Sequence, residues 1–354
     1  MGSEVVVEGL TKSFGTESIW EDVSLTLPHG EVSVLLGPSG TGKSVFLKSV
    51  IGLLRPERGS CEVDGIDVVT CSQRDLYAVR KRFGVLFQDG ALFGSMTLFD
   101  NIAFPLREHT RRGEADVRRT VLEKMELVGL DKEQDKYPGE LSGGMRKRAG
   151  LARALVLDPE VILCDEPDSG LDPVRTAYLS QLLIDLNAQI DATVLIVTHN
   201  INVARTVPDN LGMLYRRQLV LFGPREVLLT SDKPAVEQFL NGRRAGPIGM
   251  SEEKDAATLA AERARAQDAP TEDLRRIVPQ LAPTDGLPER RAVRRRKDRV
   301  MGMLHTLPEP ARRGVLASLT DQDRCRYGVP DQPGPLEQPG PLDQPGPLEQ
   351  RGTP

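Results

Sequence analysis

The sequence predicts an α/β protein with a mostly parallel core sheet. Through residues 1–245, short apolar runs rich in β-branched residues alternate with stretches of helical period. The clearest predicted strands are residues 5–7, 32–36, 85–87, 161–164 and 194–197. The last three are continuously apolar, which is typical of strands buried in a parallel sheet. Each stretch between them is long enough for the helical crossover that parallel strands require.

Composition divides the chain into three regions. Residues 1–245 carry the α/β pattern, with an inserted helical block at about residues 89–155. Residues 246–330 are predicted to be a partly helical extension, in which Ser251 can cap one helix and a second lies near residues 288–303. Residues 331–354 contain three copies of Pro-Gly-Pro-Leu-acid-Gln, and we expect disorder because such a repeat cannot build a packed core.

Charge and cysteine usage limit the possible partners. A net charge of −5 is too small to steer the molecule toward nucleic acid, so no nucleic-acid partner is expected. No window approaches the roughly 18 consecutive apolar residues of a membrane helix, and the N-terminus carries no basic-then-apolar signal. The four cysteines have no metal-ligand spacing, which favours reduced thiols in a cytosolic protein.

The motif at residues 37–44 predicts that the chain binds a nucleoside triphosphate. It follows an apolar strand, precedes a helix-like stretch, and fits the pattern G-x-x-x-x-G-K-[ST] with Gly37, Pro38, Ser39, Gly40, Thr41, Gly42, Lys43 and Ser44. Its glycines let backbone N–H groups turn toward phosphate, and the helix start adds partial positive charge. Lys43 would reach the β- and γ-phosphates, and the Ser44 hydroxyl would bind Mg²⁺.

Two acids, Asp165 and Glu166, end the predicted strand at residues 161–164. The carboxyl end of a buried parallel strand is where an α/β sheet presents its ligands. We expect Asp165 to hold Mg²⁺, directly or through water, and Glu166 to orient or deprotonate the attacking water. The alternative is an acidic turn without a catalytic role.

A third motif completes an ordered set. Residues 141–145, Leu-Ser-Gly-Gly-Met, lie between the phosphate loop and the acidic strand end, and resemble the signature of ATP-binding cassette (ABC) ATPases. The resemblance implies the ABC type of P-loop fold, including an antiparallel β region. It also implies that Ser142, Gly143 and Gly144 begin a helix and bind the γ-phosphate of the opposite subunit. Met145 replaces the usual Gln.

Further positions resemble the family one by one. Phe14 resembles the aromatic that stacks on adenine, and Gln88 the glutamine that contacts Mg²⁺ or water and relays the nucleotide state to a membrane partner. Asp172, in the stretch 169–172, resembles the loop that crosses to the other subunit, and His199 the histidine that bonds the γ-phosphate. Ordinary alternatives are a core aromatic at position 14, a polar strand end at position 88 and a histidine without function at position 199.

Because one cassette carries half of each composite site, we expect a homodimer in the ATP-bound state, with a head-to-tail arrangement about a two-fold axis. The cofactors implied are ATP and Mg²⁺. The chain would work as an ATP hydrolase that drives a separate membrane permease.

Residues 87–93 and 104–110 resemble the ATPases of Mce-type lipid transporters, including the Mla phospholipid system. Residues 37–46 and 165–175 also resemble the actinobacterial Mce-associated ATPase. The resemblance implies YrbE-like permease partners, Mce-domain proteins in the wider complex, and a cytoplasmic position, peripheral on the inner face of the cell membrane. Apolar residues that look exposed would form the docking groove: Leu92, Phe93, Phe104 and Leu106.

The sequence is compatible with other functions. A soluble ABC-type ATPase of DNA repair or translation is the main alternative, although repair members carry a long coiled coil and translation members two cassettes. A nucleotide-dependent switch is disfavoured by Glu166, and a GTPase by the missing Asn-Lys-x-Asp motif. The basic run at residues 290–297 fits a solvated helix face, a contact with another subunit or the paired ATPase, or a contact with anionic lipid headgroups.

Overall fold

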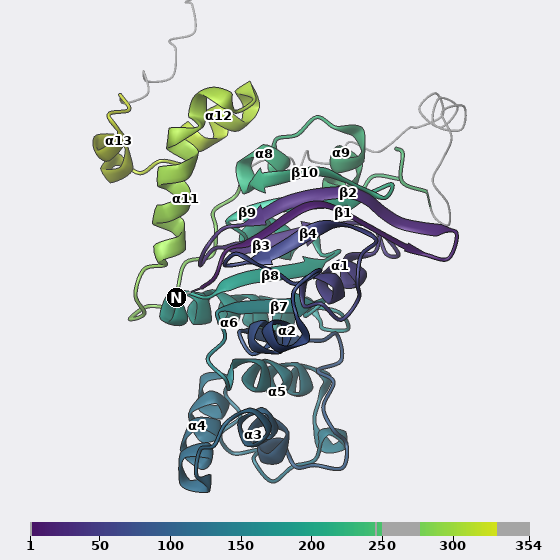
Figure 1. Cartoon of the computed structure of the whole chain (residues 1–354). Helices are drawn as coiled ribbons and strands as arrows, with labels where there is room; N and C mark the ends of the chain where they lie inside the picture. Colours follow the sequence, from purple (N-terminus) through teal and green to yellow (C-terminus); the bar gives the residue numbers. More distant parts are fainter. Residues whose placement is uncertain (1, 245, 250–276, 331–354) are drawn as a thin grey trace, which may run out of the picture.

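The computed structural model describes residues 2–244, 246–249 and 277–330 (Figure 1). The predicted helix after Ser251 and the predicted disorder of residues 331–354 lie outside these described residues. Within them, no helix combines the length and the apolar character needed to span a membrane.

A six-stranded sheet forms the centre of the molecule, in the order β10-β9-β3-β8-β7-β6. Its strands are β3 (Val32–Leu36), β6 (Phe83–Leu86), β7 (Val161–Asp165), β8 (Thr193–Thr198), β9 (Asn210–Tyr215) and β10 (Gln218–Pro224). All neighbours pair in parallel except β10, which is antiparallel to β9. The expectation of a mostly parallel core is therefore confirmed.

The bounds of β6 differ from those expected. The strand begins at Phe83 and ends at Leu86, whereas the apolar run had predicted residues 85–87. Gly84 explains the difference: an added Cβ would lie 2.4 Å from the carbonyl oxygen of Ala154. A glycine usually weakens a strand, but here it permits a close approach of backbones.

A second, four-stranded sheet packs beside the first, in the order β2-β1-β4-β5 (Figure 1). It consists of β1 (Val5–Phe14), β2 (Glu17–Leu27), β4 (Arg58–Val63) and β5 (Ile66–Asp67), and all its pairs are antiparallel. This is the antiparallel region that the family resemblance implied.

Helices surround the central sheet and build a separate lobe (Figure 1). The lobe contains α3 (Leu98–His109), α4 (Glu114–Leu127) and α5 (Gly143–Leu155), as expected for the inserted block. The others in the cassette are α1 (Lys43–Val50), α2 (Gln73–Arg80), α6 (Pro173–Ile190), α7 (Ile201–Thr206), α8 (Arg225–Leu229) and α9 (Pro234–Asn241). Side-chain caps fix several helix starts, among them Thr97 for α3, Ser142 for α5 and Asp172 for α6.

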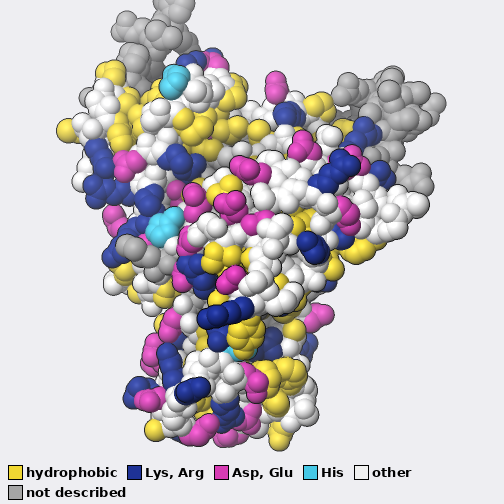
Figure 2. Space-filling view, in the orientation of Figure 1, with side chains coloured by type: hydrophobic (Ala, Val, Ile, Leu, Met, Phe, Trp, Pro, Cys, Tyr) yellow, Lys and Arg dark blue, Asp and Glu magenta, His cyan; other side chains and the backbone are white. Residues whose placement is uncertain are grey.

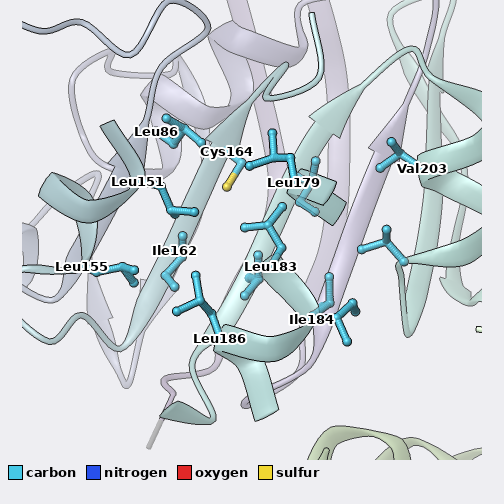
Figure 3. Close-up of a cluster of buried hydrophobic side chains, with 14 of the residues drawn as sticks. Leu86, Leu151, Leu155, Ile162, Cys164, Leu179, Leu183, Ile184, Leu186 and Val203 are labelled. Atoms are coloured by element: carbon cyan, nitrogen blue, oxygen red, sulfur yellow. The ribbon is translucent and has the colours of Figure 1, made fainter. Parts of the chain in front are cut away.

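The central sheet is buried on both faces. Side chains of β7 alternate: Ile162 and Cys164 face one cluster, and Val161 and Leu163 face the other. Figure 3 shows the first cluster, where leucines of α6 point toward Ile162 and Cys164. Burial on both faces explains the continuously apolar strands, and it holds their carboxyl ends in fixed positions.

The extension packs onto the cassette of the same chain through helix α11 (Arg291–Gly302), followed by α12 (Glu309–Ala317) and α13 (Asp321–Tyr327). Figure 2 shows Lys and Arg side chains gathered on the side of the molecule where α11 lies. Four arginines pair with acids of the cassette; the pairs are Arg290–Asp209, Arg295–Asp191, Arg296–Glu226 and Arg299–Glu31. The basic run is therefore largely occupied by contacts within the chain, an arrangement that the sequence interpretations had not included.

The pair between Arg290 and Asp209 is fully buried. Burial alone would raise the pKa of Asp209, but Arg290 and Arg296 hold that pKa below its usual range. Arg290 also donates from Nε to Asn187 Oδ1 at 2.7 Å, and Asp209 accepts from the Val32 N–H at 2.9 Å. The start of α11 is thus bonded to the last turn of α6 and, through Asp209, to the first residue of β3.

Arg290→Met should strongly destabilise the fold, because it leaves the Asp209 carboxylate buried without its main partner. The expected loss is about 3–5 kcal/mol in the free energy of unfolding, measured by chemical denaturation. Arg294→Met is the matched control, since Arg294 is exposed on the same helix and should change stability by less than about 0.5 kcal/mol. Equal stability of the two variants would contradict a structural role for this pair.

Candidate functional site

The phosphate loop lies between β3 and α1, as its motif predicted. Gly42 has φ +83° and caps α1 without a side chain, and an added Cβ would lie 2.3 Å from Ile19 Cγ2. Only glycine fits this position, and the helix start remains open toward an anion. Lys43 is buried and donates from Nζ to the carbonyl oxygens of Gly37, at 2.8 Å, and Pro38, at 2.9 Å. The ammonium group therefore sits inside the loop that would hold the phosphates.

Ser44 and Asp165 bring two oxygen donors together. The Ser44 hydroxyl donates to Asp165 Oδ1 at 2.7 Å, joining the start of α1 to the end of β7. Burial raises the pKa of Asp165 above its usual value, while Ser44, Lys48 and Lys43 oppose the shift. Hydroxyl and carboxylate oxygens are the ligands that Mg²⁺ prefers. The two residues fit the predicted metal site.

Glu166 follows Asp165 and points in a different direction. Its Oε1 lies 3.3 Å from His199 Nδ1 and 4.0 Å from Lys43 Nζ. Its backbone has φ +44°, a left-handed conformation that is strained in a residue with a side chain. The side chain is 18% exposed, so water can reach it. Lys43, Glu166 and His199, far apart in the sequence, thus meet at one edge of the sheet.

Gln88 and the loop after β7 lie beside this group. Gln88 Nε2 donates to Ser169 Oγ at 3.2 Å, and Gln88 is exposed. Thr198, next to His199, donates from Oγ1 to Asp168 Oδ1 at 2.8 Å. These bonds hold the loop after β7 against its neighbours. A movement of this loop would therefore change the hydrogen bond that Gln88 makes.

The remaining predicted residues stand apart from this group. Phe14 ends β1 with 48% of its area exposed, and Lys12 Nζ lies 5.0 Å from the centre of its ring. It is therefore not a core aromatic. Asp172 caps α6 by accepting from the Arg175 N–H at 2.9 Å.

The signature residues Ser142, Gly143 and Gly144 form the start of α5, in the helical lobe. Ser142 is exposed and accepts from the Met145 N–H at 3.3 Å. A hollow of about 410 Å³ borders Ser142 and Gly144, and Arg148 and Arg175 also line it. A second helix start, flanked by basic side chains, therefore faces open space. Among the described residues, no hydrogen bond or ion pair joins Ser142, Phe14 or Asp172 to Lys43 or Glu166.

The predicted apolar groove needs one correction. Leu106 is fully buried in the lobe and cannot line a surface, because it lies on the face of α3 that packs into the core. Phe93 is 44% exposed, and its ring centre lies 5.1 Å from that of Phe104. Phe93, Phe104 and Leu92 remain as the apolar surface of this region.

Similarity to known proteins agrees with this geometry. The family model for the ABC transporter matches residues 20–169. A protein of Mycobacterium tuberculosis (strain H37Rv), named "Probable ribonucleotide transport ATP-binding protein mkl", is 68% identical over 323 residues, which cover 90% of either chain. The chain belongs to the ABC transporter family. It is an ATP-binding subunit and an ATP hydrolase of that family, as its motifs predicted.

Two further relatives extend the picture of the family. The "Intermembrane phospholipid transport system ATP-binding protein MlaF" of Escherichia coli (strain K12) is 40% identical, covering 66% of this chain and 87% of its own. The dimeric structure of the bacterial ABC transporter cassette MJ0796 aligns with a TM-score of 0.59 at 30% identity, covering 62% of this chain and 98% of the cassette. A second structure of MJ0796, in a post-hydrolysis state with ADP and phosphate, aligns with a TM-score of 0.58. The predicted ABC fold is confirmed.

One residue of this site escaped the sequence analysis. Lys147 is 5% exposed, on the inner side of α5, and contacts the backbone just after β7. A signal was present: Lys147 shares an otherwise apolar helix face with Leu151 and Ala154. A charge on such a face indicates a buried partner.

Phe14→Ala should weaken ATP binding by about 1–3 kcal/mol, roughly 5- to 150-fold in Kd, if adenine stacks on this ring. Calorimetry with ATP measures the change, and GTP should bind appreciably because stacking reads little base identity. Phe93→Ala removes an equally exposed aromatic of the helical lobe and should leave Kd unchanged. An unaltered Kd in Phe14→Ala would mean that the base stacks elsewhere.

Proposed function

We propose that this chain hydrolyses Mg²⁺-ATP to power a permease of the Mce type that moves lipid across or between membranes. The single observation that carries the ATPase part is the meeting of Lys43, Ser44, Asp165, Glu166 and His199 at one edge of the sheet. Lys43 and the open start of α1 would bind the phosphates. Ser44, Asp165 and Gln88 would hold Mg²⁺, which neutralises phosphate charge when bound.

Glu166 is the proposed general base. Its carboxylate is partly exposed and lies between Lys43 and His199, so it can take a proton from a water held near the γ-phosphate. His199 would donate to that phosphate and help to orient Glu166. The strained backbone at Glu166 is typical of a residue held for chemistry rather than for packing.

Each catalytic site would need two copies of the chain. Ser142 and Gly144 lie in the helical lobe, whereas Lys43 lies at the central sheet, so the two anion-binding helix starts belong to different lobes (Figure 1). A head-to-tail dimer would place ATP between Lys43 of one chain and Ser142 of the other. The MJ0796 cassette, which is dimeric, supports this arrangement.

The cargo is assigned from the family resemblance. The names of the relatives differ, one naming ribonucleotide and the other phospholipid transport. We favour lipid because residues 87–93 and 104–110, which include the exposed Phe93 and the half-buried Phe104, resemble Mce-type ATPases. YrbE-like permease subunits would bind there, with Mce-domain proteins in the wider complex, and the ATPase would lie peripherally on the inner face of the membrane. Isolation of the tagged chain from its native membrane, followed by identification of its partners, tests this assignment.

Glu166→Gln should keep ATP affinity and lose turnover by roughly 10²–10⁴-fold, because only the proton transfer is removed. Turnover is measured on the assembled complex, and light scattering of the same variant should show an ATP-dependent dimer. Asp158→Asn changes an acid outside the site and should leave turnover as in the wild type. Normal turnover in Glu166→Gln would remove this residue from its proposed role.

Phe104→Asp should release the protein from membranes while the cassette stays folded and binds ATP. A charge at the Phe93–Phe104 contact would disfavour docking of an apolar helix there. Leu53→Asp, which places the same charge at an exposed site after α1, is the control and should remain membrane-bound. Sedimentation with membranes measures both. A wild-type protein that never sediments with membranes would favour the soluble ABC-type ATPase instead.

A further inference from the structure

The buried ammonium group of Lys147 bridges the helix of the signature and the turn that carries the proposed base. Lys147 Nζ donates to the carbonyl oxygen of Ser169 at 2.5 Å and to that of Glu166 at 3.2 Å. Lys147 belongs to α5, which begins at Ser142, and the two carbonyls belong to the loop after β7. No other lysine among the described residues makes hydrogen bonds to both the Glu166 and Ser169 carbonyls.

The ammonium group of Lys147 depends on its acceptors and on nearby acids. Burial lowers the pKa of Lys147 below its usual value, and Asp168, Asp89 and Glu166 partly oppose that shift. Because a buried charge is costly unless it is paired and hydrogen-bonded, both carbonyls and these acids are needed to keep the ammonium group in place. If this side chain served only to fill space, an apolar residue would fit better than a lysine, because it would not bury a charge.

The turn that Lys147 contacts is the strained one. Glu166 has φ +44°, its N–H donates to the Val197 oxygen at 2.9 Å, and its carbonyl also accepts from the Ser169 N–H at 3.1 Å. A strained conformation persists only where surrounding contacts fix it. Lys147 fixes the carbonyls at both ends of this turn, and so contributes to the direction in which the Glu166 side chain points.

We propose that Lys147 is a positioning residue for the ATPase reaction, which holds the Glu166 turn of its own chain against the signature helix. The inference rests on the proposed roles of Glu166 and Ser142. Because Ser142 would contact ATP bound by the opposite chain, the bridge joins each Glu166 to the nucleotide state of the other composite site.

The first test separates positioning from stability. Lys147→Met should reduce kcat at least tenfold while the Kd for ATP changes less than about twofold, because the phosphate-binding residues are untouched. Lys147→Arg, which keeps a charged donor, should restore most of kcat. Lys124→Met is the matched control: Lys124 is equally buried and bonds Asp158 at 2.8 Å, so its loss should lower Tm and leave kcat unchanged. If Lys147→Met is too unstable to assay, Lys147→Gln should show the same split between kcat and Kd.

The second test asks which chain Lys147 acts on, using mixed dimers with two affinity tags. In one dimer, Glu166→Gln on the first chain is combined with Lys147→Met on the second, so the only intact Glu166 lies beside the altered lysine. In the other, both substitutions lie on the first chain and the second is wild type. The first dimer should be at least tenfold less active than the second. A less active second dimer would overturn the inference, because Lys147 would then act through the signature on the opposite site. Equal activity would also overturn it, because the lysine beside the intact Glu166 would then matter no more than the other one.

Parallel measurement of Glu166→Gln keeps the two proposals distinguishable. Loss of turnover in Glu166→Gln together with full turnover in Lys147→Met would overturn only the positioning role. Full turnover in Glu166→Gln would overturn the proposed base, and with it any action of Lys147 through that residue. Equal losses of kcat in Lys147→Met and in Lys124→Met would show a merely structural lysine.

Discussion

The parallel register of β3, β7 and β8 is the constraint on which the site depends. Leu36 lies beside Thr198, and Asp165 lies beside Val197, so the three strands end at nearly the same level. The residues that follow these ends carry the phosphate loop, Glu166 and His199. Because the sheet is buried on both faces, a strand cannot slip by one residue without turning its apolar side chains the wrong way. The core thus fixes the relative positions of three segments that are far apart in the sequence.

At the opposite edge of the sheet, where the same strands begin, acidic residues lie close together. Glu31 precedes β3, Asp191 precedes β8 and Asp209 precedes β9, and Asp209 accepts the Val32 N–H. Carboxylates in this position require compensating charge when they are buried. The arginines of α11 supply it, so the extension completes the cassette at the end of the sheet far from the phosphate loop. The part of the extension that the structure describes therefore binds this end of the sheet, and none of its described residues makes a hydrogen bond or ion pair with Lys43, Asp165, Glu166 or His199.

The features that the sequence predicted best are short motifs of consecutive residues. The phosphate loop, the acidic strand end and the signature each lie within eight residues, and the alternation of apolar runs placed them at strand ends or helix starts. Pairs that join distant elements were not predictable: Arg299 and Glu31 are separated by 268 residues, and no periodicity relates them. Leu106 was misplaced for the same reason, because the packing of α3 against α4 and α5 decides which face of the helix is buried. Lys147 is a charge on an otherwise apolar helix face, but its partners are backbone carbonyls of a distant turn, and the side-chain pattern does not identify them.

Two buried lysines near Glu166, Lys43 and Lys147, differ in the backbone segments that they bind. Lys43 and Lys147 each donate to two backbone carbonyls, and burial lowers the pKa of both while nearby acids oppose the shift. The carbonyls that Lys43 contacts belong to the phosphate loop itself, so phosphate oxygens, which are charged and stronger acceptors, can replace them. The carbonyls that Lys147 contacts belong to the turn of Glu166, not to the phosphate loop. We therefore expect Lys43 to exchange partners when nucleotide binds, and Lys147 to keep its partners and maintain the direction of the carboxylate.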